Sequence, residues 1–151
     1  MSEQTCQVLT KTVAPCTIHN ILKIHPQDPR LMPDDIHYYE PAQGHGLPHD
    51  PFNAIVGPRP IGWISSQDAE GHLNLAPYSF FNAFNYIPPI IGFCSVGRKD
   101  SLNNIEQTGE FAWNLATRPL AEQMNQSCAM VAPKVNEFEL AGLTPAPSRV
   151  I

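Results

Sequence analysis

Residues 58–82, PRPIGWISSQDAEGHLNLAPYSFFN, contain the clearest structural pattern in the chain. Ile61, Trp63 and Ile64 lie just before two serines, and this apolar run predicts a strand over about residues 60–66. Residues 67–71 include Asp68 and Gly71, which are typical of a tight turn because aspartate caps local amides and glycine accepts a positive φ. Residues 72–75 then return as a second arm, so the sequence predicts a hairpin.

Further elements are predicted on the C-terminal side of this hairpin. Residues 90–94 form a short β run, and the alternation over residues 111–116 predicts another strand. A short helix is predicted from Asp100 or Ser101, either of which could cap it, to Gly109, which can end it in the left-handed conformation. Pro119 is placed to open a helix over residues 120–127, and residues 137–143 are predicted to form one irregular helical turn. The expected class is a small, mainly β barrel with short peripheral helices.

The size of the chain limits it to one domain with a modest core. It has 151 residues, of which 42% are hydrophobic. Residues 1–36 show no sustained helical or strand periodicity and contain several prolines, so we expect a disordered N-terminal extension. The working domain is expected over residues 37–151.

Charge and composition exclude several classes of function. The formal net charge is -5 and there are only nine Lys and Arg residues, so we expect no nucleic-acid partner. No apolar run approaches the roughly 20 residues that cross a bilayer, and the N-terminus lacks a secretory pattern. We therefore expect a cytoplasmic protein that does not contact membranes.

Metal and nucleophilic centres are not predicted either. Glycine and proline separate His45 from His49, which denies them the i, i+4 spacing of a helical ligand pair, and the four cysteines lack zinc-site or dithiol spacing. The sequence contains no GxSxG nucleophile elbow. We predict no metal site and no acyl-transfer chemistry.

The segment GRKDS at residues 97–101 points to an anion. It places Arg98 and Lys99 at the start of the predicted helix, where cations are unfavourable unless a bound anion offsets the helix dipole. A solvated surface turn is the alternative. In NLAPYSFFN, adjacent Phe80 and Phe81 must face opposite sides of a strand, so one ring fills the core and the other meets a ligand, a partner subunit or water.

Five segments of the chain together resemble one known family. PRPIGWISS, NLAPYSFFNAF, GRKDSLNNIE, EFAWNLAT and FELAGLTPAPSRV are similar to motifs of the flavin reductase-like family of FMN-binding split barrels, from about residue 38 to residue 151. The resemblance implies a Greek-key split β-barrel that forms a homodimer and holds FMN at or near the subunit interface. Because members of that family continue into further strands, we expect the barrel of this chain to be incomplete at its C-terminus.

The resemblance also implies which positions meet the cofactor, while no catalytic residue is predicted. The positions beside the flavin ring match Ser65 and Ser66. The flavin loop matches Asn74, Ala76, Pro77, Tyr78, Phe81 and Asn82, and the phosphate positions match Ser79, Arg98, Lys99 and Ser101.

The implied function is electron transfer through FMN. NADH or NADPH would deliver hydride to N5 of the flavin, and the electrons would pass to a second flavin, a protein or a small acceptor. The sequence has no GxGxxG motif after a strand, so the nicotinamide is expected to stack transiently on the exposed flavin face. Two alternatives stay open: an FMN-binding electron carrier without reductase activity of its own, and a truncated, inactive fragment.

Overall fold

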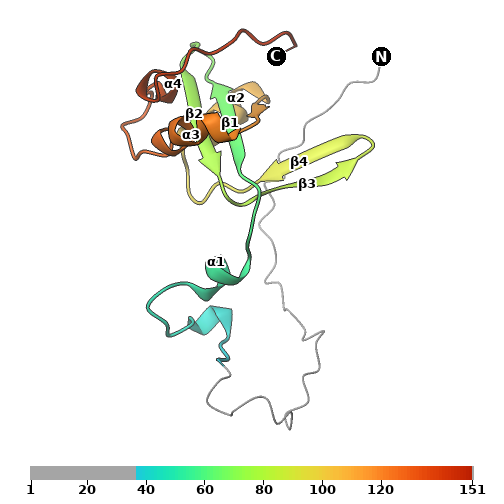
Figure 1. Ribbon diagram of the computed structural model, residues 1–151, viewed down its shortest axis with the longest axis vertical. Coiled ribbons are helices and arrows are strands. Elements are labelled where there is room, and N and C mark those ends of the chain that lie inside the picture. Colours follow the sequence, from blue (N-terminus) through green and yellow to red (C-terminus); the bar gives the residue numbers. More distant parts are fainter. Residues whose placement is uncertain (1–36, 151) are drawn as a thin grey trace. The chain divides into compact units, whose positions relative to one another are not determined.

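The computed structural model describes residues 37–150 (Figure 1). The chain divides into two compact units, whose described parts are residues 37–58 and residues 59–150. The predicted disorder of residues 1–36 concerns a segment outside the described residues. Among residues 37–150, no helix is both long and apolar enough to span a bilayer.

The smaller unit contains two short helical segments, the 3-10 helix η2 (Pro41–Gln43) and α1 (Pro51–Ile55). Asp50 caps α1, because its side chain accepts a hydrogen bond from the amide of Phe52 at 2.9 Å. Proline at the first helical position needs no amide partner, so the sequence Asp-Pro starts this helix.

The larger unit is built around an antiparallel sheet of three strands, β1 (Gly62–Gln67), β2 (Leu73–Tyr78) and β5 (Ala112–Asn114), in the order β2–β1–β5. The predicted hairpin is confirmed, although its second arm extends to Tyr78. In the connecting turn, Asp68 accepts hydrogen bonds from the amides of Glu70 and His72, both at 2.9 Å. Gly71 has a φ of 93°, which explains the glycine at this position.

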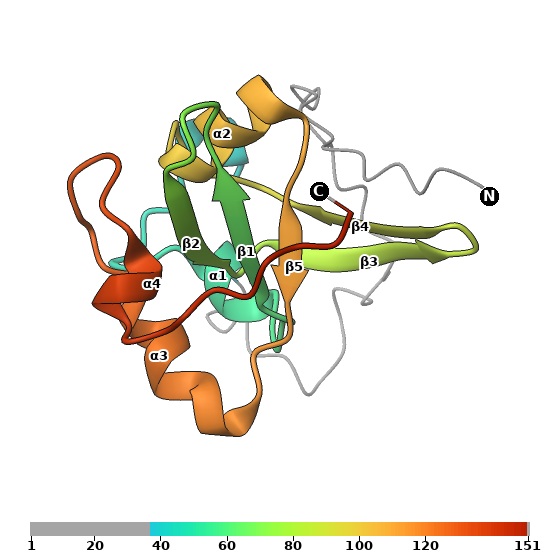
Figure 2. The same cartoon turned by 90° about the horizontal axis from the view of Figure 1, so that it is seen from above.

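A second, two-stranded sheet consists of β3 (Phe81–Tyr86) and β4 (Pro89–Phe93), and it extends away from the three-stranded sheet as a ribbon (Figures 1 and 2). Strand β4 matches the predicted third strand. Strand β3 is not among the predicted strands, because the predicted hairpin ends at residue 75 and the resemblance assigns residues 74–82 to a flavin loop. In fact only Ser79 and Phe80 connect β2 to β3, so the motif is largely strand.

Short helices complete the larger unit: α2 (Asp100–Thr108), the 3-10 helix η3 (Arg118–Leu120), α3 (Ala121–Gln126) and α4 (Glu137–Leu140). Gly109 ends α2 with a φ of 74°, as predicted. The predicted cap is wrong, because the N-cap residue is Lys99, which makes no side-chain capping bond. Asp100 instead accepts from the backbone amide of Lys134, and the hydroxyl of Ser101 accepts from Asn74.

The core lies between the sheet and α2, which covers one face of β1 and β2 (Figure 2). Ile64, Tyr78, Ile105 and Phe111 are buried together there. Trp63 is also buried, and its Nε1 donates to the hydroxyl of Ser127 after α3 at 3.0 Å. The prediction of a β-centred fold with short peripheral helices is confirmed, and the described sheets do not close into a barrel.

Candidate functional site

Two buried hydrogen bonds fix α2 to the sheet. The Nδ2 of Asn74 donates to Oγ of Ser101 at 2.7 Å, and the Nδ2 of Asn104 donates to Oγ of Ser66 at 3.2 Å. All four residues are buried. Three of them were predicted to meet the cofactor, but their side chains here join helix and sheet. Asn104 was not predicted, although its i+3 spacing from Ser101 places both on one helix face.

Ser65 lines a cavity of about 640 Å³, which is the larger cavity of the site. Its hydroxyl accepts from Nδ2 of Asn114 in β5 at 3.0 Å, and the same amide donates to the carbonyl of Trp63 at 3.1 Å. Phe111, Phe138 and residues 145–148 also line the cavity, and Ser66 borders it. The two predicted ring-side serines therefore share a cavity with aromatic and proline walls.

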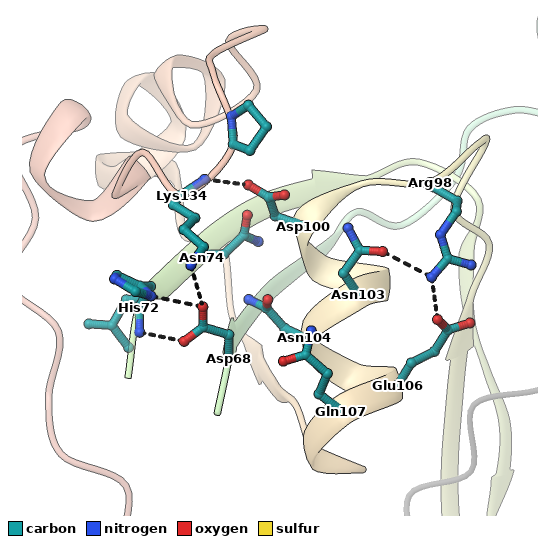
Figure 3. A pocket seen from close by; sticks show the side chains of 12 residues that line it. Asp68, His72, Asn74, Arg98, Asp100, Asn103, Asn104, Glu106, Gln107 and Lys134 are labelled. Atoms are coloured by element: carbon teal, nitrogen blue, oxygen red, sulfur yellow. Dashed lines mark hydrogen bonds and ion pairs between the residues drawn. The ribbon is translucent and has the colours of Figure 1, made fainter. Parts of the chain in front are cut away.

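The start of α2 carries the two predicted phosphate-binding cations, and both are exposed. Arg98 forms an ion pair with Glu106, and its Nη2 also donates to Oδ1 of Asn103 at 3.0 Å (Figure 3). Lys99 takes part in no ion pair within residues 37–150. Of the two cations, Lys99 is therefore the one that is not already neutralised.

A smaller cavity of about 460 Å³ lies beside α2, with Arg98 and Lys134 at its opposite ends (Figure 3). The Nζ of Lys134 lies 2.9 Å from a carboxylate oxygen of Glu70 and 3.9 Å from one of Asp68. Both cations therefore face carboxylates, and the cavity is not electropositive. Its remaining walls are mainly polar and comprise His72, Leu73, Asn74, Asp100, Asn103, Asn104, Glu106, Gln107 and Pro133.

One cluster on the turn between β1 and β2 has metal-ligating side chains. One ligand atom each of Asp68, Glu70 and His72 lies within 4.8 Å of the others. Burial raises the pKa of Asp68, but hydrogen bonds from His72 and the Glu70 amide outweigh it and lower the pKa to about 2. The ammonium of Lys134 supplies positive charge at this cluster, so ordinary ion pairing accounts for the arrangement.

The other predicted residues are divided between the core and the start of the ribbon. Tyr78 is buried, and Ala76 and Pro77 are half-buried in β2. Ser79 is exposed, and its carbonyl accepts from Nε of Arg59 at 3.1 Å. These residues line neither cavity.

The two adjacent phenylalanines face different surroundings, as predicted. Phe81 is buried and stacks on the ring of Trp113, with 5.6 Å between ring centroids. The Phe81 ring also passes over Gly62, where an added Cβ would lie 2.4 Å from it. Phe80 is half-buried, and its ring centroid lies 5.1 Å from the guanidinium carbon of Arg59. Asn82 is exposed, and its side chain accepts from the next amide in the chain.

The structure thus brings together only some of the predicted residues. Asn74 and Ser101 are in direct contact, Asn74 and Arg98 line the smaller cavity, and Ser65 and Ser66 border the larger one. The residues that sequence reasoning missed are Asn104, Glu106 and Lys134. The spacing from Ser101 could have indicated Asn104, whereas the partners of Glu106 and Lys134 lie 8 and 64 positions away in the chain, beyond any local pattern.

Comparison with known families identifies the chain. A model of the flavin reductase-like domain matches residues 57–151. The chain belongs to this family, which confirms the resemblance found in its motifs. A protein from Aquifex aeolicus with no assigned function is 41% identical over 102 residues, covering 64% of this chain and 52% of that protein.

Solved structures show the same relationship. Component B of nitrilotriacetate monooxygenase from Bacillus cereus has a TM-score of 0.66 and 31% identity, covering 77% of this chain and 60% of that one. The 2-nitrobenzoate 2-nitroreductase NbaA of Pseudomonas fluorescens has a TM-score of 0.60 and 35% identity, covering 66% and 49%. A Shewanella frigidimarina protein described as a split-barrel flavin reductase has a TM-score of 0.61 and 29% identity, covering 66% and 50%.

These matches define the fold, which is that of the split-barrel flavin reductases. The chain spans about half the length of the curated relatives that it matches.

Proposed function

We propose that this chain is an FMN-binding oxidoreductase domain that passes electrons from NADH or NADPH through FMN to a flavin or another acceptor. The observation that carries the proposal is the segment of residues 97–101, where Arg98 and Lys99 precede a helix whose N-cap makes no side-chain capping bond. Helix N-termini with free amides and adjacent cations are sites for phosphate groups.

The charge balance of this segment favours Lys99 as the main phosphate contact. Its ammonium is exposed and unpaired among the described residues. Arg98 would first have to leave Glu106, but both partners are exposed, and such surface pairs contribute only about 0–1 kcal/mol. A dianionic phosphate can compete with that interaction. Ser79, on the adjoining turn, completes the proposed phosphate set.

The larger cavity is the proposed place for the aromatic ring. Its volume of about 640 Å³ suits a bound organic ligand, and Phe111, Phe138 and the prolines of residues 145–148 provide flat apolar walls. Ser65 and Asn114 supply polar groups at its edge. Ser65 and Ser66 are the proposed ring-side residues, whereas the flavin-loop positions that the resemblance implies, Asn74, Ala76, Pro77, Tyr78, Phe81 and Asn82, lie outside this cavity.

Within this proposal, the chain's own residues have separate tasks. FMN, when bound, would supply the two-electron acceptor chemistry. The hydrogen bond from Asn74 to Ser101 holds the first turn of α2 on the sheet and so fixes the phosphate-binding end, whereas the bond from Asn104 to Ser66 holds the next turn. Because no side chain is assigned a catalytic proton transfer, substitutions are expected to act through flavin binding.

We also propose a homodimer, with the ribbon β3–β4 as a contact surface. Residues 79–97 contain no charged side chain or histidine. The side chains of Phe84, Tyr86 and Ile87 are 65%, 82% and 74% exposed. An uncharged apolar surface of this kind is typical of protein interfaces.

We also propose a cytoplasmic location, which suits Cys94 and Cys128, because both are free and exposed.

An FMN-binding electron carrier is the second candidate function. It would share the same flavin site, so the two candidates differ only in the reaction with the nicotinamide. The sequence has no dinucleotide-binding motif, so NAD(P)H would have to bind through the flavin alone. This observation favours the electron carrier.

The test is a fluorescence titration of the full chain with FMN and with riboflavin, followed by NADH and NADPH oxidation with free riboflavin as acceptor. Saturable binding that is tighter for FMN, with nicotinamide oxidation, is the expected result. Binding without oxidation would indicate the electron carrier. No binding of either flavin would contradict the proposal and leave the inactive-fragment alternative.

A further inference from the structure

The hydroxyl of Tyr78 is a buried polar group without a hydrogen-bond partner among the described residues. Tyr78 is only 5% exposed, and its ring packs against Phe93 with 4.5 Å between ring centroids. A buried hydroxyl that lacks a partner destabilises the protein, because it has given up its hydrogen bonds to water. Such a group therefore needs an explanation, and phenylalanine would fill the same space without this cost.

Tyr78 shares the buried core cluster with Ile105 of α2, and its ring contacts Phe93, two residues before Ser95, so it lies close to the segment that leads into α2. Burial is the main effect on the pKa of Tyr78 and raises it, the nearby hydroxyls of Ser101 and Ser95 lower it, and the carboxylates of Glu137 and Asp100 raise it further. The net direction is upward, so the phenol is neutral at physiological pH and keeps its proton to donate.

Both neighbouring serines can accept another hydrogen bond. Ser101 accepts from Asn74 at 2.7 Å, and Ser95 donates to the carbonyl of Gly97 at 2.9 Å. A hydroxyl oxygen can accept two hydrogen bonds, so each oxygen retains acceptor capacity. A small movement of either serine toward Tyr78 would satisfy the phenol.

Ser95 and Ser101 also bracket the proposed phosphate-binding residues. Between them, residues 96–99 are exposed, and Gly97 adopts a φ of 79°. At the helix start, the amides of the first turn have no intrahelical partner, and the N-cap residue Lys99 makes no side-chain capping bond. The exposed residues 96–99 and the free amides of the first turn are therefore the groups of this segment that an anion would meet.

We propose that Tyr78 is a positioning residue that favours FMN over riboflavin: when a phosphate binds at residues 97–101, the Tyr78 hydroxyl gains a hydrogen bond to Ser95 or Ser101. The proposal rests on the proposed function and adds a residue that acts through the segment, without touching the phosphate. The hydrogen bond is made only in the phosphate-bound state, so its free energy contributes to selectivity.

The test compares wild type and Tyr78→Phe as full chains, each titrated with FMN and riboflavin and unfolded by denaturant without ligand. The variant is expected to be at least as stable as wild type, because it removes an unpaired hydroxyl. Its affinity for FMN should fall about 5- to 10-fold, the value of one hydrogen bond, while its affinity for riboflavin should stay within about twofold.

Two further variants separate this role from general effects on the helix. Ser95→Ala removes one of the two acceptors and should weaken FMN binding selectively, by about 2- to 3-fold. Asn104→Ala removes the sheet contact one turn further along α2. It should lower stability while leaving the ratio of FMN to riboflavin affinity unchanged.

Four results would overturn the inference. A loss of ligand-free stability in Tyr78→Phe would mean that the hydroxyl already has a structural partner. Unchanged FMN affinity, or equal losses for both flavins, would mean that it does not serve the phosphate. If wild type itself binds no FMN, the proposed function fails and this inference with it, whereas failure in the variant alone leaves the proposed function intact.

Discussion

The interface between the sheet and α2 differs sharply from the β3–β4 ribbon. At the interface, the polar groups of Ser66 and Asn104 are paired with each other, and Ile64 is fully buried. On the ribbon, large apolar side chains such as Tyr86 are exposed and no charges accompany them. The motif NLAPYSFFNAF runs through both regions. Its first half therefore builds the scaffold, and its second half leads into exposed apolar side chains.

The largest expected effect is the loss of packing at the interface. Ile64→Ala should reduce the free energy of unfolding by about 2–5 kcal/mol, because it leaves a cavity beneath α2. Val96→Ala is the matched control, because Val96 is exposed and lies outside helices and strands. Its effect should stay within about 0.5 kcal/mol. Denaturant unfolding checks both, and similar losses would break the distinction between scaffold and surface.

A second prediction concerns Glu137, which is buried at the outer edge of β2. One carboxylate oxygen accepts from the amide of Leu75 at 3.0 Å. Glu137→Ala would leave this amide unpaired and should cost about 1–3 kcal/mol in denaturant unfolding. Glu137→Gln keeps an acceptor of the same shape and is the control. A harmless alanine variant would show that water replaces the carboxylate and that this edge is not part of the rigid scaffold.

The same residue predicts a dependence of stability on pH. Burial raises the pKa of Glu137 above its ordinary value of 4.5, against the hydrogen bond from Leu75. The folded state therefore holds the proton more tightly than the unfolded state, and the contribution of this group to stability falls as pH rises from about 4.5 through the folded pKa. Glu137→Gln should remove this decline. Unfolding curves across this range check it, and an identical pH profile in the variant would contradict it.

The smallest of these effects concerns the β3–β4 ribbon, which is compared with the interface between the sheet and α2. Ile87→Lys places a charge on an exposed apolar surface, so it should weaken self-association about tenfold or more without changing the fold. Sedimentation over a range of concentrations measures the association, and circular dichroism controls for folding. Lys substituted at Met130, which is 96% exposed outside the ribbon, is the matched control. Equal effects of both substitutions would remove the ribbon from the interface.

The sequence was informative where structure depends on neighbours in the chain. The turn at Asp68 and Gly71 and the end of α2 at Gly109 were both predicted, because these residues act through their own backbone. Strand β3 was missed because FNAFNY has no alternating pattern, with only Phe81 buried, and because its start lies in the segment that the resemblance assigns to the flavin loop. The lesson is that a match to a binding motif does not exclude regular secondary structure.

The site was less predictable because its interactions join distant segments. Ser101 was expected at the phosphate, and its hydroxyl oxygen also accepts a hydrogen bond from Asn74, which lies 27 positions earlier. Arg98 was expected to contact the phosphate, and the geometry of α2 also brings Glu106 to it. Residue type indicated the chemistry of the segment, whereas burial and side-chain direction decided which groups remain available.

The most direct test of the central claim is the affinity of Lys99→Ala for FMN and for riboflavin, measured by flavin fluorescence. Loss of a charge-assisted contact should weaken FMN binding by about 1–3 kcal/mol and leave riboflavin binding unchanged. Arg98→Ala should act in the same direction. Lys134→Ala, at the other end of the smaller cavity, should not change the ratio. Equal losses for FMN and riboflavin in Lys99→Ala would contradict phosphate recognition at residues 97–101.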